Sequence, residues 1–221
     1  MGKYKVGKET KDKIFEASKA LFYESGYTST TCLKIARESG ANVGLINYYY
    51  GSKGGLGIEL YNEIMSTIKA KVAENLTKLG IQTSLLLQTA IEWRVLNNNM
   101  RFNKNFSRFY YDLLSENVLY KEQSVVTDFY RKLTESCGLD YSDFEIAFIS
   151  YSSAGATQGI NLAYDAGLID CSSQDFINAS IRLLLNTMGL DAKLNEQVIK
   201  ESYAIEKNFT VRIEKTLSSS R

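Results

Sequence analysis

The 221-residue sequence contains no proline and no histidine. Proline interrupts helices, so its absence favours a chain built from long helices. The missing histidine removes the commonest general base and the commonest transition-metal ligand. We therefore expect no metal site, no cofactor and no enzymatic activity. An enzyme of the helical body that uses paired carboxylates stays open as an alternative.

Cysteines and long apolar runs are also scarce. Cys32, Cys137 and Cys171 lie far apart and show no CxxC spacing, which indicates reduced thiols of a cytosolic protein. No apolar run approaches the roughly 18 residues that a membrane span needs, and the start "MGKYKVGKETKDK" has no apolar segment after its basic residues. The sequence predicts a soluble cytoplasmic protein without a membrane partner.

Charge is unevenly distributed along the chain. Residues 1–55 hold nine Lys or Arg against five Asp or Glu, whereas residues 56–221 hold 17 against 20. A basic head on a slightly acidic body is typical of proteins that bind a polyanion. We expect the first lysines, Lys3, Lys5 and Lys8, to form a solvated, disordered arm.

The basic head has the pattern of three helices. Apolar residues recur at helical spacing over Glu9 to Glu24, and Gly26 ends that segment. Thr30 or Thr31 caps a second helix, "TTCLKIARES".

A third, very short helix follows after a turn of three residues. Asn42 caps "VGLINYYY", and Gly51 closes it. The turn "GAN" has the length that a helix-turn-helix unit uses to set two helices at a steep angle. In that unit the second helix is the exposed recognition helix.

A helical wheel divides the third helix into two faces. Ile46 and Tyr50 face inward, and Val43, Gly44, Asn47 and Tyr48 face outward, with Leu45 and Tyr49 on the flanks. An outward Asn offers the paired donor and acceptor that read adenine, and apolar groups contact thymine methyls. A tyrosine hydroxyl and a lysine ammonium, here Tyr49 and Lys53, suit DNA phosphates.

The segment "GYTSTTCLKIARESGANVGLINYYYGSKGGL" resembles the DNA-binding domain of TetR/AcrR-family transcriptional regulators. Its Gly-aromatic entry, Thr cap, Ile-Ala helix, Gly turn and "INYYYGSKGGL" signature all have counterparts there. The likeness covers about residues 10 to 58. It implies an all-helical homodimer that binds operator DNA and senses a small molecule.

The resemblance, together with the helical wheel, assigns DNA-binding roles to nine positions. They are Thr31, Lys34, Val43, Gly44, Leu45, Asn47, Tyr48, Tyr49 and Lys53. The sequence differs from the family at four positions, Leu33, Val43, Leu45 and Asn47. At these positions the family frequently has a polar residue or Tyr. These residues predict a less charged, more apolar reading surface.

Longer helices fill the rest of the chain. We predict helices over 56–79, 81–98, 102–115, 118–136, 142–166, 173–189 and 193–217, with one break at "NNNM" near Asn97 to Met100. The fold class is all-α. A helix-turn-helix DNA-binding domain spans 1–55, and a larger helical-bundle domain for ligand sensing and dimerisation spans 56–221.

Two features of the body suggest sites, and each has a plainer interpretation as ordinary core or intrachain packing. Aromatic residues at helical spacing suggest an apolar pocket for a hydrophobic molecule, lined by Trp93, Phe102, Phe106, Phe109, Tyr110, Tyr130 and Tyr151. The small-residue helix around "SSAGATQGINLAYDAG" allows close helix approach. By the family's arrangement, the resemblance implies a dimer interface of Tyr151, Gly155, Gly159, Leu162, Ile177, Ile181 and Leu184.

These observations predict a ligand-responsive transcriptional regulator. We expect a repressor that binds a palindromic operator as a homodimer and is released by a small hydrophobic effector. The alternative is a helical adaptor whose helix-turn-helix does not read DNA directly, which the apolar Leu33, Val43 and Leu45 would favour.

Overall fold

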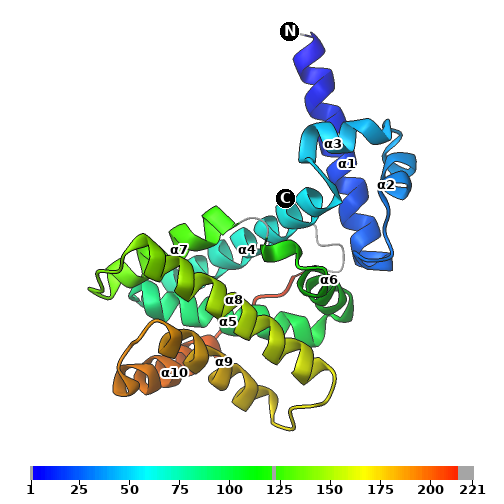
Figure 1. The fold of residues 1–221 in the computed structure, drawn as a ribbon. Helices are drawn as coiled ribbons and strands as arrows, with labels where there is room; N and C mark the ends of the chain where they lie inside the picture. The colour runs from blue at the N-terminus through cyan, green and yellow to red at the C-terminus, as the bar shows by residue number, and fades with distance from the viewer. Residues whose placement is uncertain (1, 121–122, 214–221) are drawn as a thin grey trace. The chain divides into compact units, whose positions relative to one another are not determined.

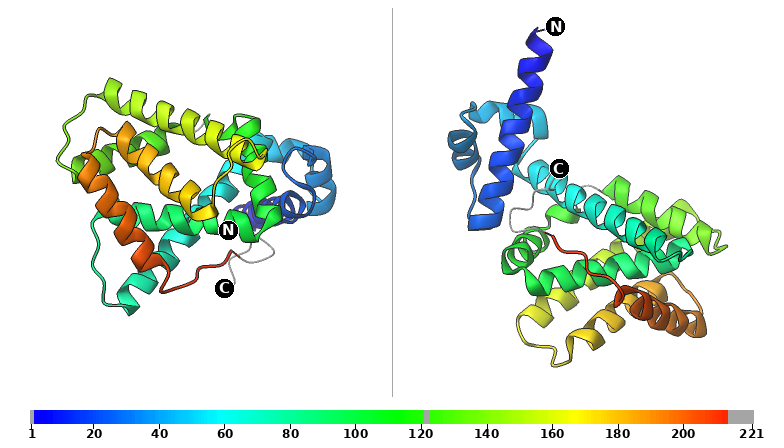
Figure 2. Two further views of the ribbon diagram at one scale, coloured as in Figure 1. Left: turned by 90° about the horizontal axis from the view of Figure 1, so that it is seen from below. Right: turned by 180° about the vertical axis from the view of Figure 1, so that it is seen from behind.

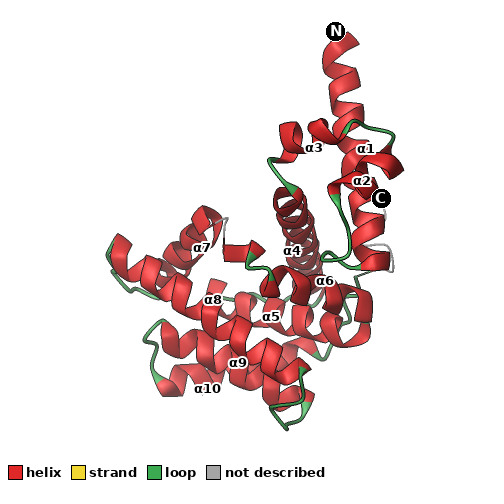
Figure 3. Cartoon of the chain, turned by 45° about the vertical axis from the view of Figure 1, so that its right-hand side comes forward, coloured by secondary structure: helices red, strands yellow, loops and turns green. Residues whose placement is uncertain are grey.

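The computed structural model describes residues 2–120 and 123–213, and that part of the chain is helical without a strand (Figures 1 and 3). The elements are α1 (Gly2–Ser25), α2 (Cys32–Ser39), α3 (Val43–Tyr50), α4 (Lys53–Lys78), α5 (Leu85–Phe102), α6 (Lys104–Ser115), the 3₁₀ turn η1 (Val118–Tyr120), α7 (Gln123–Ser136), α8 (Asp143–Asp165), α9 (Ser173–Thr187) and α10 (Ala192–Glu206). The all-α prediction is confirmed. No helix in these ranges is long and apolar enough to cross a membrane.

The helices form two compact units. The first contains Met1–Thr67 and Met100–Leu119, and the second contains Ile68–Asn99 and Tyr120–Arg212. Helices α4 and α5 contribute residues to both units. A functional boundary at residue 55 stays a prediction.

The core of the first unit joins the helix-turn-helix to α4 and α6. Ile14, Ile35 and Ile46 supply one fully buried aliphatic residue each from α1, α2 and α3. On the other side of α1, Phe22 stacks against Phe109 of α6 with ring centroids 5.8 Å apart. Helix α1 therefore packs on α6 as well as on the two helices of the helix-turn-helix.

Two glycines are required by close approach in this unit. A Cβ on Gly55 would lie 1.9 Å from the carbonyl oxygen of Tyr50, so the start of α4 passes directly against the end of α3. Gly26 has a φ of +86°, which glycine adopts at little cost, and its Cα faces the side chains of Arg108 and Asp112. A larger residue at Gly55 would displace the end of α3, and one at Gly26 would have to move the side chains of Arg108 and Asp112.

The second unit packs α7, α8, α9 and α10 in succession, as the two views of Figure 2 show. Its core gathers residues from α5 and from these four helices. Members include Leu133, Ile149, Ile181, Met188 and Val198. Hydrophobic burial holds these amphipathic helices together.

Three predicted boundaries are wrong. Helix α1 begins at Gly2 rather than Glu9, so the backbone of the expected disordered arm is helical; the side chains of Lys3 and Lys5 lie outside the described part. The last helix ends at Glu206 rather than near residue 217.

The third wrong boundary is the predicted break at Asn97 to Met100. Helix α5 continues through these residues to Phe102. The amides of Asn97 and Asn99 donate to the carbonyls of Trp93 and Val95, one turn earlier. Asn99 also donates to the carbonyl of Val211. Partners inside the helix and in a distant segment thus compensate for the poor helix propensity of asparagine.

Candidate nucleic-acid interface

The two helices of the helix-turn-helix begin at side-chain caps. Of the two candidate threonines, Thr31 caps α2, and its hydroxyl accepts a hydrogen bond from the backbone N–H of Lys34 at 3.2 Å. Thr30 is buried instead and donates to the carbonyl of Gly26. Asn42 caps α3 as predicted and accepts from the N–H of Gly44 at 2.8 Å. The caps fix where α3 starts and hence which of its residues face outward.

The inner face of α3 is the predicted one. Ile46 is fully buried. The ring of Tyr50 stacks on Phe15, with centroids 6.3 Å apart, and its hydroxyl donates to the carbonyl of Lys11. Both contacts are with α1, so one tyrosine of the "YYY" run is a packing residue.

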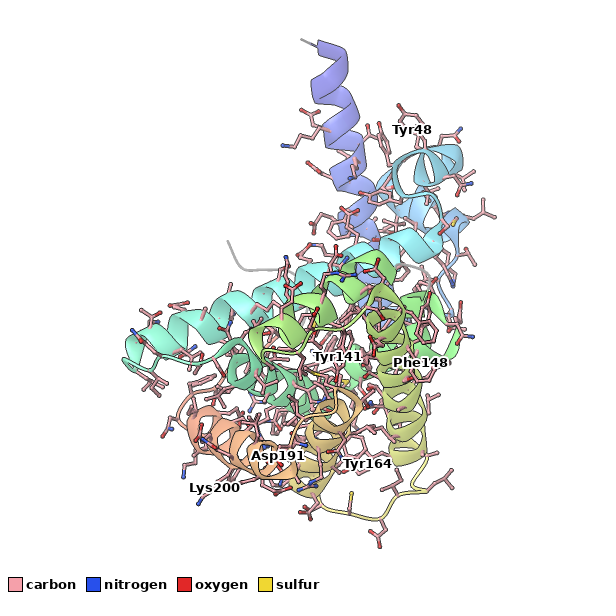
Figure 4. All side chains as sticks on the ribbon, turned by 60° about the vertical axis from the view of Figure 1, so that its left-hand side comes forward. Tyr48, Tyr141, Phe148, Tyr164, Asp191 and Lys200 are labelled. Carbon is pink, nitrogen blue, oxygen red and sulfur yellow. The ribbon has the colours of Figure 1, made fainter. Side chains whose placement is uncertain are left out.

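The outer face carries an apolar and amide surface. Val43, Gly44 and Asn47 are exposed, Leu45 is half-buried, and Tyr48 is 78% exposed. Figure 4 labels Tyr48 on this helix. The side-chain amide of Asn47 has no hydrogen-bond partner among the described residues. An amide and a ring presented to solvent on one short helix are suited to a base edge.

Leu33 extends this apolar character onto α2. Its side chain is 71% exposed, one residue before Lys34. The ammonium of Lys34 donates to the carbonyl of Ser29 at 3.0 Å and is otherwise exposed. A single exposed leucine is common on protein surfaces, so contact of Leu33 with another molecule stays a prediction.

Tyr49 lies between the two faces. Its ring meets that of Tyr48 edge-on, with centroids 5.0 Å apart, and its hydroxyl lies against Gly7 of α1. The hydroxyl is therefore at the side of the helix rather than at its tip. This place is compatible with the predicted phosphate contact, which stays a prediction.

Lys53 differs from the expected free ammonium. Its Nζ donates to the carbonyl of Tyr27 at 3.1 Å and lies 4.0 Å from the centroid of that ring. An oxygen of Glu116 is 3.9 Å away. Burial raises the pKa of the Tyr27 hydroxyl to about 12, with a smaller effect of the Glu116 charge.

Sequence reasoning missed a polar edge of α6 in the same unit. Arg108 donates to the carbonyls of Tyr23 and Glu24, at 2.8 Å each. Asp112 and Glu116 accept from the backbone N–H and the hydroxyl of Thr28, at 2.9 and 2.7 Å. The spacing i, i+4, i+8 places the three charges on one helix face, and that spacing was the available signal.

The predicted ligand-pocket residues divide between the two units. Phe106, Phe109 and Tyr110 are buried in the core of the first unit, and Phe102 is exposed. Trp93, Tyr130 and Tyr151 belong to the second unit, where Tyr130 is in the core and Trp93 packs against it, while Tyr151 is half-exposed. Of the α6 rings, Phe109 packs against Phe22 of α1 and Tyr110 lies near Tyr61 of α4, and the shared pocket stays a prediction.

The second unit does contain buried polar atoms without a partner in the described part of the chain. They include the indole N–H of Trp93, the hydroxyl of Ser150 and the side-chain oxygen of Asn161. Leaving such a group unpaired costs roughly 1–3 kcal/mol. Groups of this kind are potential contacts for a ligand that supplies the missing hydrogen bonds.

The predicted dimer residues divide between surface and core. Ile177 and Ile181 are buried within this unit, so their assignment to a contact with a second copy is wrong: they face inward from α9. Leu184 and Leu162 are partly buried. Tyr151, Gly155 and Gly159 are exposed on α8.

Two unexpected aromatic residues continue the exposed side of α8. Phe144 and Phe148 are 75% and 65% exposed, with ring centroids 6.1 Å apart (Figure 4 labels Phe148). With Tyr151 they follow the i, i+4, i+7 spacing of one helix face. This surface, the α8 face, is too apolar to be expected in contact with water alone.

Comparison with known proteins identifies the N-terminal segment. Residues 14–60 match the family described as bacterial regulatory proteins, tetR family. The chain is 36% identical over 80 residues to the probable HTH-type transcriptional regulator YttP of Bacillus subtilis (strain 168), which is 35% of this chain and 39% of that protein. It is 37% identical over 67 residues to LmrA of the same strain, covering 30% and 36%. The chain thus spans less than two fifths of the length of these curated relatives.

Solved structures resemble the fold over most of the chain. Thermus thermophilus FadR, a TetR-family repressor in complex with lauroyl-CoA, superposes with a TM-score of 0.57 at 18% identity, over 82% of this chain and 96% of that one. TylP, a TetR regulator of Streptomyces fradiae, superposes with a TM-score of 0.51 at 18% identity, over 92% and 94%. At this identity the likeness concerns the fold.

Proposed function

We propose that this chain, whose residues 14–60 match the tetR family of bacterial regulatory proteins, is a DNA-binding transcriptional repressor acting in the cytoplasm. The observation that carries the proposal is the outer face of α3, where the unpartnered amide of Asn47 lies beside the exposed ring of Tyr48. Both side chains are free to meet base edges in a major groove. Residues 1–55 would bind the operator, and residues 56–221 would sense the effector and dimerise.

We propose a homodimer formed through the α8 face. Exposed Phe144, Phe148 and Tyr151 supply apolar area, and a Cβ at Gly159 would meet no other atom within 4 Å, which leaves room for a second helix. A two-fold dimer presents two recognition helices about 34–36 Å apart, so the operator would be a palindrome.

We propose that the effector is a small hydrophobic molecule that also carries hydrogen-bonding groups. The unpaired atoms of Trp93, Ser150 and Asn161 support this, because a purely apolar ligand would leave their cost uncompensated. The effector would favour a conformation that binds operator poorly, and operator would weaken effector binding by the same factor. Trp93 is the one tryptophan of the sequence, so its fluorescence reports effector binding directly.

The test is a selection of bound duplexes from random DNA, followed by titration of the enriched duplex at two salt concentrations. We expect a palindrome whose affinity falls steeply with salt, since phosphate contacts release counterions. An Asn47→Ala, Tyr49→Ala double variant should lose the preference. The matched control is Asn208→Ala, Tyr203→Ala on the other unit, which removes the same residue types and should keep it.

A folded dimer that enriches no duplex would contradict the proposal. It would favour the adaptor alternative, for which the exposed Leu33 would be a protein contact.

A further inference from the structure

Glu116 has two oxygens with different partners. Oε1 accepts a hydrogen bond from the hydroxyl of Thr28 at 2.7 Å, and Oε2 lies 3.9 Å from the ammonium of Lys53. The first contact orients the carboxylate, and the second places its charge beside Lys53. Thr28 also donates its backbone N–H to Asp112, so the segment that presents the hydroxyl is itself held.

Lys53 is enclosed on the other sides by Tyr27. The carbonyl of Tyr27 accepts from Nζ, and its ring lies beneath the same ammonium. The Lys53 side chain is 21% exposed, so it remains in contact with solvent. The ammonium thus makes a hydrogen bond to the Tyr27 carbonyl and has the Tyr27 ring and the Glu116 carboxylate as its other neighbours.

The local backbone favours an anion at this point. Lys53 is the first residue of α4, and a helix N-terminus carries a positive partial charge that adds to the ammonium. Glu116 follows the last residue of α6, where a negative charge is unfavourable unless a cation lies close. Each residue thus compensates the unfavourable position of the other.

We propose that Glu116 is an internal substitute for a DNA phosphate, which holds Lys53 until operator displaces it. The inference rests on the proposed DNA-binding function. A phosphate and a carboxylate present the same chemistry to an ammonium, an anionic oxygen that accepts a charge-assisted hydrogen bond. DNA therefore gains the contact with Lys53 only by breaking the contact with Glu116, and Glu116 lowers affinity for every duplex alike.

Charge removal distinguishes this exchange from simple phosphate binding. A lysine that meets a phosphate releases counterions from DNA and contributes about −0.9 to the slope of log K against log salt. A single carboxylate does not condense counterions as DNA does, so breaking its ion pair with Lys53 changes the affinity and leaves that slope almost unchanged. The slope contribution of Lys53 should therefore be present in the wild type and absent from Lys53→Met.

The experiment measures the affinity of the full-length chain for a random-sequence duplex over a salt series. The variants are Glu116→Gln, Lys53→Met and the double variant, and the control is Glu135→Gln. Glu135 is exposed on α7, so the control removes the same formal charge in the second unit. The glutamine at 116 keeps an oxygen for Thr28.

We expect Glu116→Gln to bind about threefold more tightly per protomer, because a partly exposed ion pair is weak, with a slope close to that of the wild type. Lys53→Met should abolish this gain, and Glu135→Gln should behave as the wild type. An affinity of Glu116→Gln equal to the wild type, or a gain that persists without Lys53, would overturn the proposal.

Unfolding of the wild type, Glu116→Gln, Lys53→Met and the double variant separates this result from failure of the proposed function. A double-mutant cycle should give favourable coupling between Glu116 and Lys53 without DNA. If no protein in the set binds any duplex while that coupling is present, the DNA-binding function is overturned, and the competition with it. Absence of the coupling overturns the inference alone.

Discussion

The hydroxyl of Tyr50 donates a hydrogen bond of 2.7 Å to the carbonyl of Lys11, which attaches the end of the recognition helix to α1. The Lys11 ammonium lies 5.1 Å from the centroid of the same ring. Burial raises the pKa of the Tyr50 hydroxyl, so it stays a donor over the whole physiological range. The neighbouring Tyr48 is exposed.

Tyr50→Phe should destabilise the protein by about 1 kcal/mol, because the Lys11 carbonyl loses its donor while ring packing persists. Urea unfolding followed by circular dichroism measures the change. Tyr48→Phe is the matched control and should leave stability unchanged. Equal stability of both variants would mean that water replaces the bond without cost.

Leu33 should contact thymine methyl groups if it meets DNA. Replacing thymine by uracil at the responsible positions of the selected duplex removes one methyl each, which should weaken wild-type binding about fourfold per buried methyl. Leu33→Ala should lose most of this sensitivity. If wild type and variant respond equally at every thymine, Leu33 does not read a methyl group.

Phe148→Asp should convert a dimer into monomers, because it puts a charge in the centre of the α8 face. Sedimentation velocity measures the state at several concentrations. Leu168→Asp, at a position 79% exposed outside the α8 face, is the control and should remain dimeric. A Phe148→Asp dimer of unchanged affinity would exclude this face as the interface.

Glu92→Gln should stabilise the protein near neutral pH. Burial raises the pKa of the Glu92 carboxyl. The amide of Gln88, which donates to it at 2.9 Å, and the charge of Lys69 both lower the pKa, but by less. The folded state therefore binds the proton more tightly than the unfolded state. Wild-type stability is lost as pH rises from the ordinary glutamate pKa through the raised one.

The advantage of Glu92→Gln should accordingly grow with pH across that window and stay constant above it. Thermal unfolding from pH 4 to pH 8 measures it. Glu201→Gln, at a partly exposed position of α10, serves as the control. A variant no more stable than the wild type at pH 7 would show that Glu92 is adequately compensated when ionised.

The helix-turn-helix was predictable in detail because its signals are local. Asn42, Gly40 and Gly51 act within one turn of the helices they cap, and the inward positions of Ile46 and Tyr50 follow from helical periodicity. The error at Asn97 to Met100 has the opposite origin. Asn98 and Asn99 are held by Glu206 and Val211, more than a hundred residues away, and such partners leave no local pattern.

The sequence by itself determined the helical class, the caps and the residues on each face of α3, since these depend on intrinsic backbone preferences and a 3.6-residue period. Tertiary structure decided what each outward group meets. It placed Lys53 beside Glu116, turned Ile177 and Ile181 into the core, and left Phe144 and Phe148 exposed. Periodicity divides a helix into faces, but only the packing of distant segments decides which face is covered.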